Sequence, residues 1–400
     1  MINLFRQYKA AYTGLPKTAW TLSLVILINR TGTIVFFFMT LYLTTQKDFS
    51  VSEAGRMISL YGVGALIGSL LGGWLTDKVG AFQVQKVSLI LTGIGYIVLG
   101  YEDSSLGIGI LLFLIAIVSE AFRPANSTAM AAVCPPEVRS RGFALNRLAV
   151  NVGVTIGPAI GGFLATINYL YLFWIDGITC FGAAILLWFF FHGIRIDEEK
   201  SDSNKFQAVI SPWKDGVFLF VLLLLLFMGI AFFQLFNTWP LYLKNVYNLL
   251  EDKIGLLMAL NAFMVAVIEM PLVYKLENTN VIKIMGLGGF LILLGFGILP
   301  FDNTIYYAIF TVIIWTSGEI LVFPFMAGFI ANRATDKNRG KYMGMFSFTF
   351  SLALVIGPVM GTWIYDTFSP ETLWYGIGIT AFFIWLGFVI VYNRLKLENE

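Results

Sequence analysis

Ionisable side chains in the middle of long apolar runs are the residues of this sequence that could do chemistry. Three are carboxylates, Glu120, Glu269 and Glu319, and two are arginines, Arg30 and Arg123. An ionised group is costly in the hydrocarbon core of a membrane, so such residues commonly mark ion or substrate pathways. A buried carboxylate can take up and release a proton, because burial disfavours its charged form. We therefore take these five as candidates for proton coupling and for a substrate cavity.

Two of the carboxylates have different neighbours along the chain. Glu120 lies three residues before Arg123, so the two can pair across one turn of a helix. This pair is either structural or part of the transport pathway. Glu319 is followed by an uncharged run, so its partner must come from another helix, for example from Arg30 or Arg123. We expect Glu319 to carry a proton or bind a cation, and a static ion pair is the alternative.

The role of Glu269 is open, and two further ionisable residues, Arg147 and Asp176, lie in apolar runs. Glu269 stands two residues before Pro271 and is either a second proton carrier or a charge at a helix end. Arg147 lies about two turns inside its helix, from where its long side chain can extend to the cytoplasmic surface. Asp176 lies nearer the outer end of its helix, and we expect a structural role for it.

The composition indicates which solvent surrounds these residues. The chain has 400 residues, of which 58% are hydrophobic and 12% charged. Soluble domains carry about 25% charged residues, and one core of this size could not shelter so much apolar surface from water. The solvent for most side chains must therefore be lipid. The formal net charge of +2 does not indicate a nucleic-acid partner, and one histidine and two cysteines argue against a metal centre.

Apolar runs of spanning length, separated by short polar breaks, extend over the whole sequence. Within a bilayer they must be helices, because open strand edges would leave backbone groups without partners. We expect twelve such helices, at 19–44, 52–76, 82–100, 106–133, 139–165, 169–193, 213–244, 252–274, 281–300, 304–331, 339–366 and 371–394. The longest polar interval falls at the midpoint of the chain. The expected domains are an N-terminal six-helix bundle (1–194), a cytoplasmic linker (195–212) and a C-terminal six-helix bundle (213–400).

Lysine and arginine are concentrated in alternate loops of this arrangement. Cytoplasmic loops of membrane proteins carry an excess of these residues. The bias places both termini in the cytoplasm. We expect a multi-pass protein of the cell (inner) membrane.

Several residues recur in the second half of the chain at nearly the same offset of 200 residues. Both copies of the Arg-Gly helix are expected to run from inside to outside. The halves are therefore parallel repeats, an architecture found in transporters. The recurring pairs are Pro124 and Pro324, Gly157-Pro158 and Gly357-Pro358, Gly161 and Gly361, Arg141-Gly142 and Arg339-Gly340, and Glu120 and Glu319.

The segment 72–85, GGWLTDKVGAFQVQ, closes one expected helix and enters a cytoplasmic loop. It resembles the loop motif of the major facilitator superfamily, a glycine-rich helix end followed by Asp, a basic residue and Gly. It departs from the family pattern at Ala81 and Phe82, where basic residues are usual. The resemblance implies a conformational gating motif made of Gly73, Asp77, Lys78 and Gly80.

The segment 139–164, RSRGFALNRLAVNVGVTIGPAIGGFL, resembles the fifth-helix motif of superfamily members classed as drug–proton antiporters. Glycines four residues apart let two helices touch, and a proline can bend the helix between them. In the first expected helix, NRTGTIVFFFMTLYL is similar to small bacterial members of the same group. The helix-packing residues so implied are Gly153, Gly157, Pro158, Gly161 and Gly162, with Gly357, Pro358 and Gly361 in the second copy.

The resemblance covers essentially the full chain. It implies an all-α membrane protein with twelve transmembrane helices in two parallel-repeat six-helix bundles. We expect a secondary active transporter that works by alternating access and exports amphipathic small molecules in exchange for protons. The alternative is a proton-coupled symporter importing a peptide or other small metabolite, in which Arg30 and Glu319 bind the carboxylate and the amine of a zwitterion. Aromatic residues could line a cavity for lipophilic cargo or face lipid: Phe36, Phe37, Phe38, Phe232, Phe233, Phe236 and Trp239.

The partners expected are a small-molecule substrate, protons as the coupling ion, and the lipid bilayer. We expect no nucleic acid, no cofactor and no metal site, and we expect a monomer. No Ser/His/Asp arrangement or ATP-binding loop can be recognised, which argues against an enzyme and against a primary pump.

Overall fold

The computed structural model of the chain describes residues 14–135, 138–191, 212–276, 279–333 and 339–399. Every element of regular secondary structure in these ranges is a helix, as the sequence predicts. The linker expected at 195–212 lies outside the described residues except for Pro212.

Contacts divide the chain into two compact units. The first consists of Met1–Phe37 and Val63–Lys200, and the second of Phe38–Gly62 and Ser201–Glu400. The parts of the chain around residues 38–62 therefore group with the second unit by their contacts. The domain boundaries predicted from the sequence stay a prediction.

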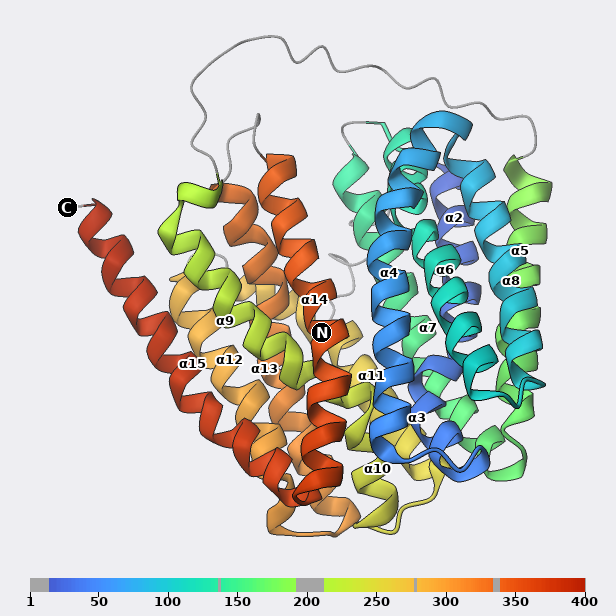
Figure 1. Cartoon of the computed structure of the whole chain (residues 1–400). Coiled ribbons are helices and arrows are strands. Elements are labelled where there is room, and N and C mark those ends of the chain that lie inside the picture. The colour runs from blue at the N-terminus through green and yellow to red at the C-terminus, as the bar shows by residue number, and fades with distance from the viewer. Residues whose placement is uncertain (1–13, 136–137, 192–211, 277–278, 334–338, 400) are drawn as a thin grey trace, which may run out of the picture. The chain divides into compact units, whose positions relative to one another are not determined.

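The N-terminal half of the chain contains seven described helices, drawn in blue to green in Figure 1. Within the first unit, α5 packs against α6 and α8, and α2 packs against α7. The helices are α2 (Lys17–Thr31), α3 (Val35–Gln46), α4 (Val51–Val79), α5 (Ala81–Gly100), α6 (Ser105–Val133), α7 (Arg139–Ile167) and α8 (Leu170–Phe191).

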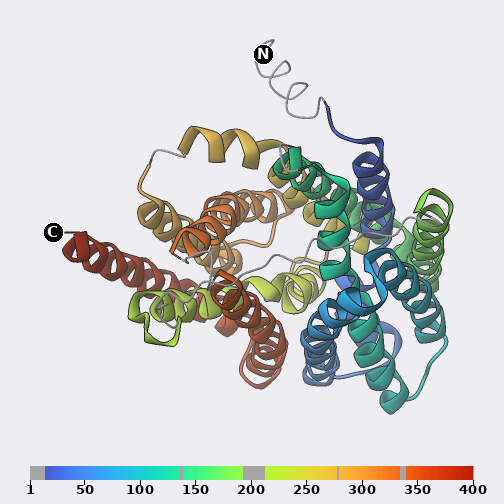
Figure 2. The same ribbon diagram turned by 90° about the horizontal axis from the view of Figure 1, so that it is seen from above.

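The C-terminal half repeats this packing within the second unit. Here α12 packs against α13 and α15, α9 packs against α14, and α11 packs against α13. Figure 2 shows the helices of each unit from above as a closely packed group. The elements are η2 (Pro212–Lys214), α9 (Gly216–Phe232), η3 (Phe233–Phe236), α10 (Thr238–Asn245), α11 (Glu251–Leu276), α12 (Val281–Gly297), η4 (Leu299–Phe301), α13 (Ile305–Arg333), α14 (Arg339–Thr367) and α15 (Pro370–Asn399).

The helix boundaries repeat with the predicted offset. Helices α4 to α8 begin at residues 51, 81, 105, 139 and 170, and α11 to α15 begin at 251, 281, 305, 339 and 370, each 200 residues later. Helices α6, α7, α13 and α14 all have 29 residues. The two halves therefore share one helical scaffold.

Eleven helical stretches among the described residues are long and apolar enough to cross a membrane. Helix α11, which matches the span expected at 252–274, is not among them, although its 26 residues correspond to about 39 Å at a rise of 1.5 Å per residue. The all-α membrane fold is thus confirmed, and the total of twelve spans stays a prediction.

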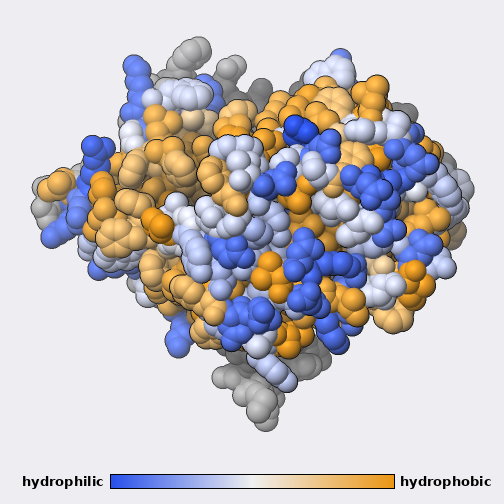
Figure 3. Space-filling model, turned by 60° about the horizontal axis from the view of Figure 1, so that its bottom comes forward, coloured by the Kyte–Doolittle hydropathy of each residue, from blue (hydrophilic) through white to orange (hydrophobic). Residues whose placement is uncertain are grey.

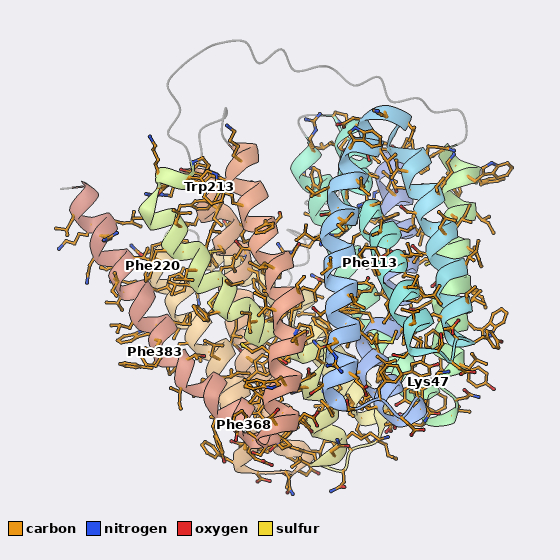
Figure 4. All side chains as sticks on the ribbon, viewed as in Figure 1. Lys47, Phe113, Trp213, Phe220, Phe368 and Phe383 are labelled. Atoms are coloured by element: carbon orange, nitrogen blue, oxygen red, sulfur yellow. The ribbon has the colours of Figure 1, made fainter. Side chains whose placement is uncertain are left out.

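Large apolar side chains are exposed over wide areas of the surface (Figure 3). Phe383 projects outward from α15 in Figure 4 and is 61% exposed, and Phe189 on α8 is 72% exposed. Soluble monomers rarely expose extended apolar patches, whereas lipid-facing helices must. These faces are suited to contact with lipid tails.

The first helix of each half is interrupted near its middle, where the sequence predicts continuous helices over 19–44 and 213–244. Helix α2 ends at Thr31, and α3 begins only at Val35. In the second half, α9 passes into the short helix η3, and α10 begins at Thr238. A regular helix would pair the backbone N–H and C=O groups at these positions internally. At each break some of these groups lie unpaired in apolar surroundings, so they need hydrogen-bond partners from other helices.

Candidate functional site

Glu319 lies on α13 and is held by a neighbouring helix of the second unit. The side-chain amide of Asn261, on α11, donates to Glu319 Oε2 at 2.7 Å and to the hydroxyl oxygen of Thr316 at 3.1 Å. Thr316 is fully buried and Asn261 is buried, whereas Glu319 is half-buried. The sequence predicts that the partner of Glu319 comes from another helix, and Asn261 is one such partner.

An aromatic cluster lies next to this carboxylate along α13. Phe323 follows Glu319 by four residues, so the two share one face of the helix. The ring of Phe323 contacts Phe232 edge to face, with centroids 5.1 Å apart, and Phe350 on α14 at 5.4 Å. We call the set of rings connected in this way the aromatic cluster, consisting of Phe232, Phe233, Phe236, Phe323, Phe346 and Phe350.

Of the aromatic residues singled out in the sequence, Phe232, Phe233 and Phe236 belong to the aromatic cluster. Trp239 is fully buried and packs edge to face against Trp315, so it faces neither lipid nor substrate. Phe37 and Phe38 are buried as well. By contrast, Phe236, Phe323 and Phe350 are half-buried and so keep part of their ring surface accessible.

A carboxylate beside aromatic rings can bind an organic cation through two kinds of interaction. The carboxylate supplies an opposite charge, and ring faces attract cations through their quadrupole. The same rings bury the apolar part of a ligand. The second unit therefore contains the chemical groups needed to bind an amphipathic molecule and to exchange a proton.

Glu269 lies on the same helix as Asn261, eight residues further on, which corresponds to about 12 Å along the axis. Its side chain is buried, at 4% exposure. Pro271, two residues later, is inside the helix. The two roles proposed for Glu269, a second proton carrier and a charge at a helix end, stay a prediction.

Glu120 and Arg123 form the ion pair that their spacing predicts. On α6, Arg123 Nη1 lies 3.3 Å from Glu120 Oε2. The Arg123 side chain is 70% exposed and that of Glu120 is 18% exposed. The negative charge of Glu120 is therefore compensated by its own helix.

Arg30 lies in the last turn of α2, next to the first helix break. Gly153 and Gly157 of α7 pack closely here: a Cβ atom at Gly153 would lie 2.7 Å from Arg30 Cβ, and one at Gly157 would lie 2.9 Å from the Thr31 carbonyl oxygen. The Nε atom of Arg30 is buried and has no hydrogen-bond partner among the described residues. The close contact with Gly153 packs the stem of Arg30 against α7.

Asp176 holds the first helix break together. It lies on α8, is fully buried, and accepts hydrogen bonds from the backbone N–H of Ile34 at 3.0 Å (Oδ1) and 3.2 Å (Oδ2) and of Val35 at 3.0 Å (Oδ2). These N–H groups begin α3, so the carboxylate satisfies backbone donors and interacts favourably with the helix dipole. This arrangement agrees with the structural role expected for Asp176.

The second helix break is held by an amide instead. Gln234 in η3 donates to the carbonyl oxygens of Ile230 at 2.9 Å and of Gly357 on α14 at 2.8 Å. Its Oε1 accepts from the Thr238 hydroxyl at 2.9 Å. A Cβ atom at Gly361 would lie 2.0 Å from Gln234 Oε1, so glycine is needed there to admit this side chain. In both halves the glycine-proline motif thus packs against the break of the first helix.

The remaining motif glycine positions have simpler surroundings. Pro158, Gly161 and Gly162 are buried on α7, and Pro358 is buried on α14. Their assignment as packing residues stays a prediction.

The loop motif ends α4 with a backbone that needs glycine. Gly80 has a φ angle of +89°, in the left-handed region that L side chains rarely adopt. Lys78 Nζ lies 3.9 Å from the centroid of the Trp74 ring, and Asp77 is exposed. A Cβ atom at Gly73 would meet nothing within 4 Å, so this glycine does not mediate helix packing within the described residues. The gating role of these residues stays a prediction.

Close packing of α4 instead uses glycines that the sequence analysis did not single out. Gly64, Gly68 and Gly72 recur every four residues, and Cβ atoms there would lie 2.4, 2.3 and 2.5 Å from backbone atoms of α6. Small residues at this spacing let two helices approach closely. The spacing alone could have identified them.

A charged cluster that the sequence analysis did not identify lies at the N-terminus of α9. Asp215 caps the helix by accepting from the Phe218 N–H at 3.0 Å, and Arg333 of α13 donates to both of its oxygens, at 2.6 and 2.8 Å. The hydroxyl of Tyr342 on α14 donates at 2.9 Å. Partial burial raises the pKa of Asp215, but these hydrogen bonds outweigh it, and the pKa ends below its usual value. The cluster ties together the ends of three helices.

No group of three or more His, Cys, Asp or Glu side chains in the described part of the chain is placed to hold a metal ion. The polar residues that the sequence analysis missed, Asn261, Thr316 and Gln234, are uncharged and buried in apolar helices. Each is a polar residue within an apolar run. Because burying an unpaired polar group is costly, such a residue is expected to have a hydrogen-bond partner.

Several known proteins are similar to this chain. A family model described as Major Facilitator Superfamily matches residues 22–336 and 254–399. A Na(+), Li(+), K(+)/H(+) antiporter of Planococcus maritimus is 24% identical over 392 residues, which cover 90% of each chain. Multidrug resistance protein 2 of Bacillus subtilis is 23% identical over 363 residues, covering 86% of this chain and 84% of the relative. A crystal structure of a peptide transporter, POT, in complex with sulfate has a TM-score of 0.81 at 14% identity and 96% coverage of both chains, which shows a common fold.

Proposed function

The chain belongs to the major facilitator superfamily, and on that premise we propose that it is a secondary active transporter that exports amphipathic small molecules in exchange for protons. It spans the membrane, in agreement with its apolar helices. We propose further that it lies in the cell membrane of a bacterium as a monomer with both termini in the cytoplasm, and that it works by alternating access.

The observation that carries this proposal is the position of Glu319. Its carboxylate is half-buried, accepts a hydrogen bond from Asn261, and lies one helical turn from Phe323 of the aromatic cluster. A group in such a place can bind either a proton or the cationic part of a ligand. Competition between the two at one carboxylate couples their movements in opposite directions, because the site releases one when it takes up the other.

The named relatives support the two parts of the proposal separately. A relative whose name contains proton antiport supports exchange of protons for a second solute. A relative named for multidrug resistance supports small amphipathic molecules as that solute. The aromatic cluster agrees with the second part, since rings bury apolar surface without demanding one specific shape.

The direction of transport can be tested in liposomes that contain the purified protein. In one preparation the lumen holds a lipophilic cationic dye, and in the other a labelled dipeptide is outside. A proton gradient is then imposed in each direction. We expect dye to move against the proton flux and the dipeptide to remain outside. Dipeptide uptake along the proton gradient, without dye movement, would contradict export.

One observation favours a second candidate, the import of a peptide or other zwitterion with protons. The Nε atom of Arg30 is buried without a hydrogen-bond partner among the described residues, and a buried donor of this kind can bind an anionic oxygen. A substrate carboxylate would supply it, and a peptide transporter shares the fold. An Arg30→Gln variant that loses dipeptide uptake but keeps dye movement would separate the two candidates.

A further inference from the structure

Three basic side chains lie at one end of the second unit, on helices that pack against one another. Lys214 directly precedes the cap of α9, Lys283 is in the first turn of α12, and Arg394 is near the end of α15. All three are exposed. We name them the basic patch and propose that it binds the headgroup of an anionic phospholipid. This inference goes beyond the proposed function, because lipid binding does not depend on what the protein transports.

The packing of α15 against α9 places Arg394 beside the beginning of α9. A Cβ atom at Gly387 of α15 would lie 2.5 Å from the side chain of Leu224 of α9. Arg394 follows Gly387 by seven residues, so the two share one face of α15. A Cβ atom at Gly216, the first residue of α9, would lie 4.0 Å from Arg394 Nη1. Lys214 is only two residues before Gly216, so the two basic side chains come from neighbouring points of the surface.

The packing of α15 against α12 brings Lys283 to the same end. A Cβ atom at Gly286 of α12 would lie 3.0 Å from the Cβ atom of Phe388 of α15. One turn further along α15, the ring centroid of Tyr392 lies 4.6 Å from Lys283 Nζ. The ring face attracts the ammonium group and favours this position. Since α9 and α12 also contact each other, the three basic side chains belong to one group of helix ends.

The positive charge of the patch is not balanced by its neighbours. Asp215, next to Lys214, accepts hydrogen bonds on both oxygens from Arg333, which compensates its negative charge. No member of the basic patch forms an ion pair with a side chain that the structure describes. An anionic headgroup is therefore favoured. A zwitterionic headgroup is disfavoured in comparison, because it brings a positive charge of its own to the patch.

The surface that continues from the patch is suited to acyl chains. Leu223 and Phe227 of α9 are exposed, as are Phe383 and Ile390 of α15. Clusters of basic residues next to apolar membrane helices attract anionic lipids. A free anion would contact the patch alone, whereas a phospholipid also covers these apolar side chains. We therefore assign the site to a phospholipid and not to a free phosphate ion.

A tryptophan marks the level of the headgroups. Trp213 directly precedes Lys214, is 72% exposed, and lies at the beginning of α9 (Figure 4). Tryptophan is enriched at the membrane–water interface, where its ring lies at the level of the headgroups. Lys214 and Arg394 are thus at the depth of the lipid phosphate, to which arginine can donate two parallel hydrogen bonds. In the proposed orientation this end faces the cytoplasm.

Binding can be measured by native mass spectrometry of the full-length protein, delipidated in detergent. Phosphatidylglycerol or phosphatidylcholine with the same acyl chains is added. We expect the first phosphatidylglycerol to bind about tenfold more tightly than the first phosphatidylcholine. Lys214→Gln combined with Arg394→Gln should reduce this preference to less than about twofold. Inorganic phosphate at the concentration of the lipid should not displace it, and displacement would mean a site for a free anion and overturn the proposal.

The matched control combines Arg56→Gln with Lys253→Gln. These side chains are 64% and 50% exposed and lie near the beginnings of α4 and α11, outside the patch. The control removes one arginine and one lysine as well, so it should keep the preference for phosphatidylglycerol. An equal loss in both double variants would mean that net charge alone sets the preference, and would overturn the proposal. Equal binding of the two lipids by the unchanged protein would also overturn it.

The exposure of Lys214 and Arg394 predicts that their variants fold, and a melting temperature in detergent like that of the unchanged protein checks this. If the double variant does not fold, two single variants test the same site. Arg394→Lys keeps the charge and should retain the preference for phosphatidylglycerol, whereas Arg394→Gln should weaken phosphatidylglycerol binding by about fivefold. Equal binding by these two variants would contradict the assignment.

Discussion

Helices α6 and α13 occupy equivalent places in the two halves but differ in the surroundings of their carboxylates. They begin 200 residues apart, have the same length, and contain Pro124 and Pro324 at the same place. On α6, Glu120 is paired with Arg123 of its own helix. On α13, Phe323 stands where Arg123 would be, and Glu319 is bonded to an amide of α11. The shared scaffold therefore reflects packing, and the difference lies in these partners, an arginine of the same helix for Glu120 and an amide of another helix for Glu319.

The comparison suggests that the second half contains the group that exchanges ions. On α6, the guanidinium of Arg123 lies one helical turn from Glu120 and pairs with it within a single helix. Glu319 is instead bonded to the neutral amide of Asn261 on another helix and lies beside aromatic rings. Changes that make one helix resemble the other test this view most severely.

The largest effect is expected from placing an arginine beside Glu319. Phe323→Arg puts a cation four residues after the carboxylate, where the two can pair along the helix. The pair would resemble that of α6, with a spacing of four residues in place of three, and would hold Glu319 in its charged form, so we expect proton-driven transport to fall by about 100-fold or more, equivalent to about 2.7 kcal/mol. Dye efflux from liposomes measures this. Phe323→Leu is the control for loss of the ring, and equal activity of the Arg and Leu variants would weaken the comparison.

The next effect concerns stability in the first half. Asp176→Asn replaces an acceptor-only carboxylate by an amide, one end of which would oppose the N–H groups of Ile34 and Val35. An unsatisfied buried donor costs about 1–3 kcal/mol, so the melting temperature in detergent should fall by several degrees. Asp48→Asn, at an exposed position, should leave it unchanged. A variant at 176 that melts like the unchanged protein would remove Asp176 from the helix break.

A smaller effect is expected at the polar end of the second unit, and it should depend on pH. Folding lowers the pKa of Asp215, so the ionised group stabilises the protein above its unfolded pKa, about 3.9, and this contribution is lost as the pH falls through the lower folded pKa. Asp215→Asn should therefore lower the melting temperature at pH 7. The difference from the unchanged protein should shrink below about pH 4. A difference that persists unchanged at pH 3 would mean that the charge of Asp215 does not stabilise the fold.

The smallest effect is expected from Glu120→Gln. The Glu120–Arg123 pair has an arginine that is 70% exposed, and exposed ion pairs contribute about 0–1 kcal/mol. If the pair has the structural role that its spacing allows, transport should stay within about twofold of the unchanged protein. Loss of proton-driven transport in this variant would mean that the first half also takes part in coupling.

The sequence predicts the scaffold well and the contacts of the site only in part. Helix positions follow from runs of apolar residues, and the Glu120–Arg123 pair follows from a spacing of three residues. Partners that are distant in the chain do not follow. Asn261 lies 58 residues from Glu319, and Arg333 lies 118 residues from Asp215.

The helix breaks show the same limit. Gly32 and its neighbours look compatible with a continuous apolar helix, and the break is held by Asp176, which is 142 residues away from Ile34. In the second half, Gln234 finds its acceptor at Gly357, 123 residues away. Hydropathy predicts which segments span the membrane. It does not predict which buried polar side chain forms hydrogen bonds with the unpaired backbone groups of a segment.

The central claim, that Glu319 and not its counterpart Glu120 exchanges protons, is tested most directly by comparing Glu319→Gln with Glu120→Gln in liposomes. Each variant is measured twice, for dye transport driven by a proton gradient and for dye exchange at equal dye concentrations without a gradient. We predict that Glu319→Gln loses the driven transport but retains exchange, whereas Glu120→Gln retains both. Driven transport by Glu319→Gln at the rate of the unchanged protein would contradict the account.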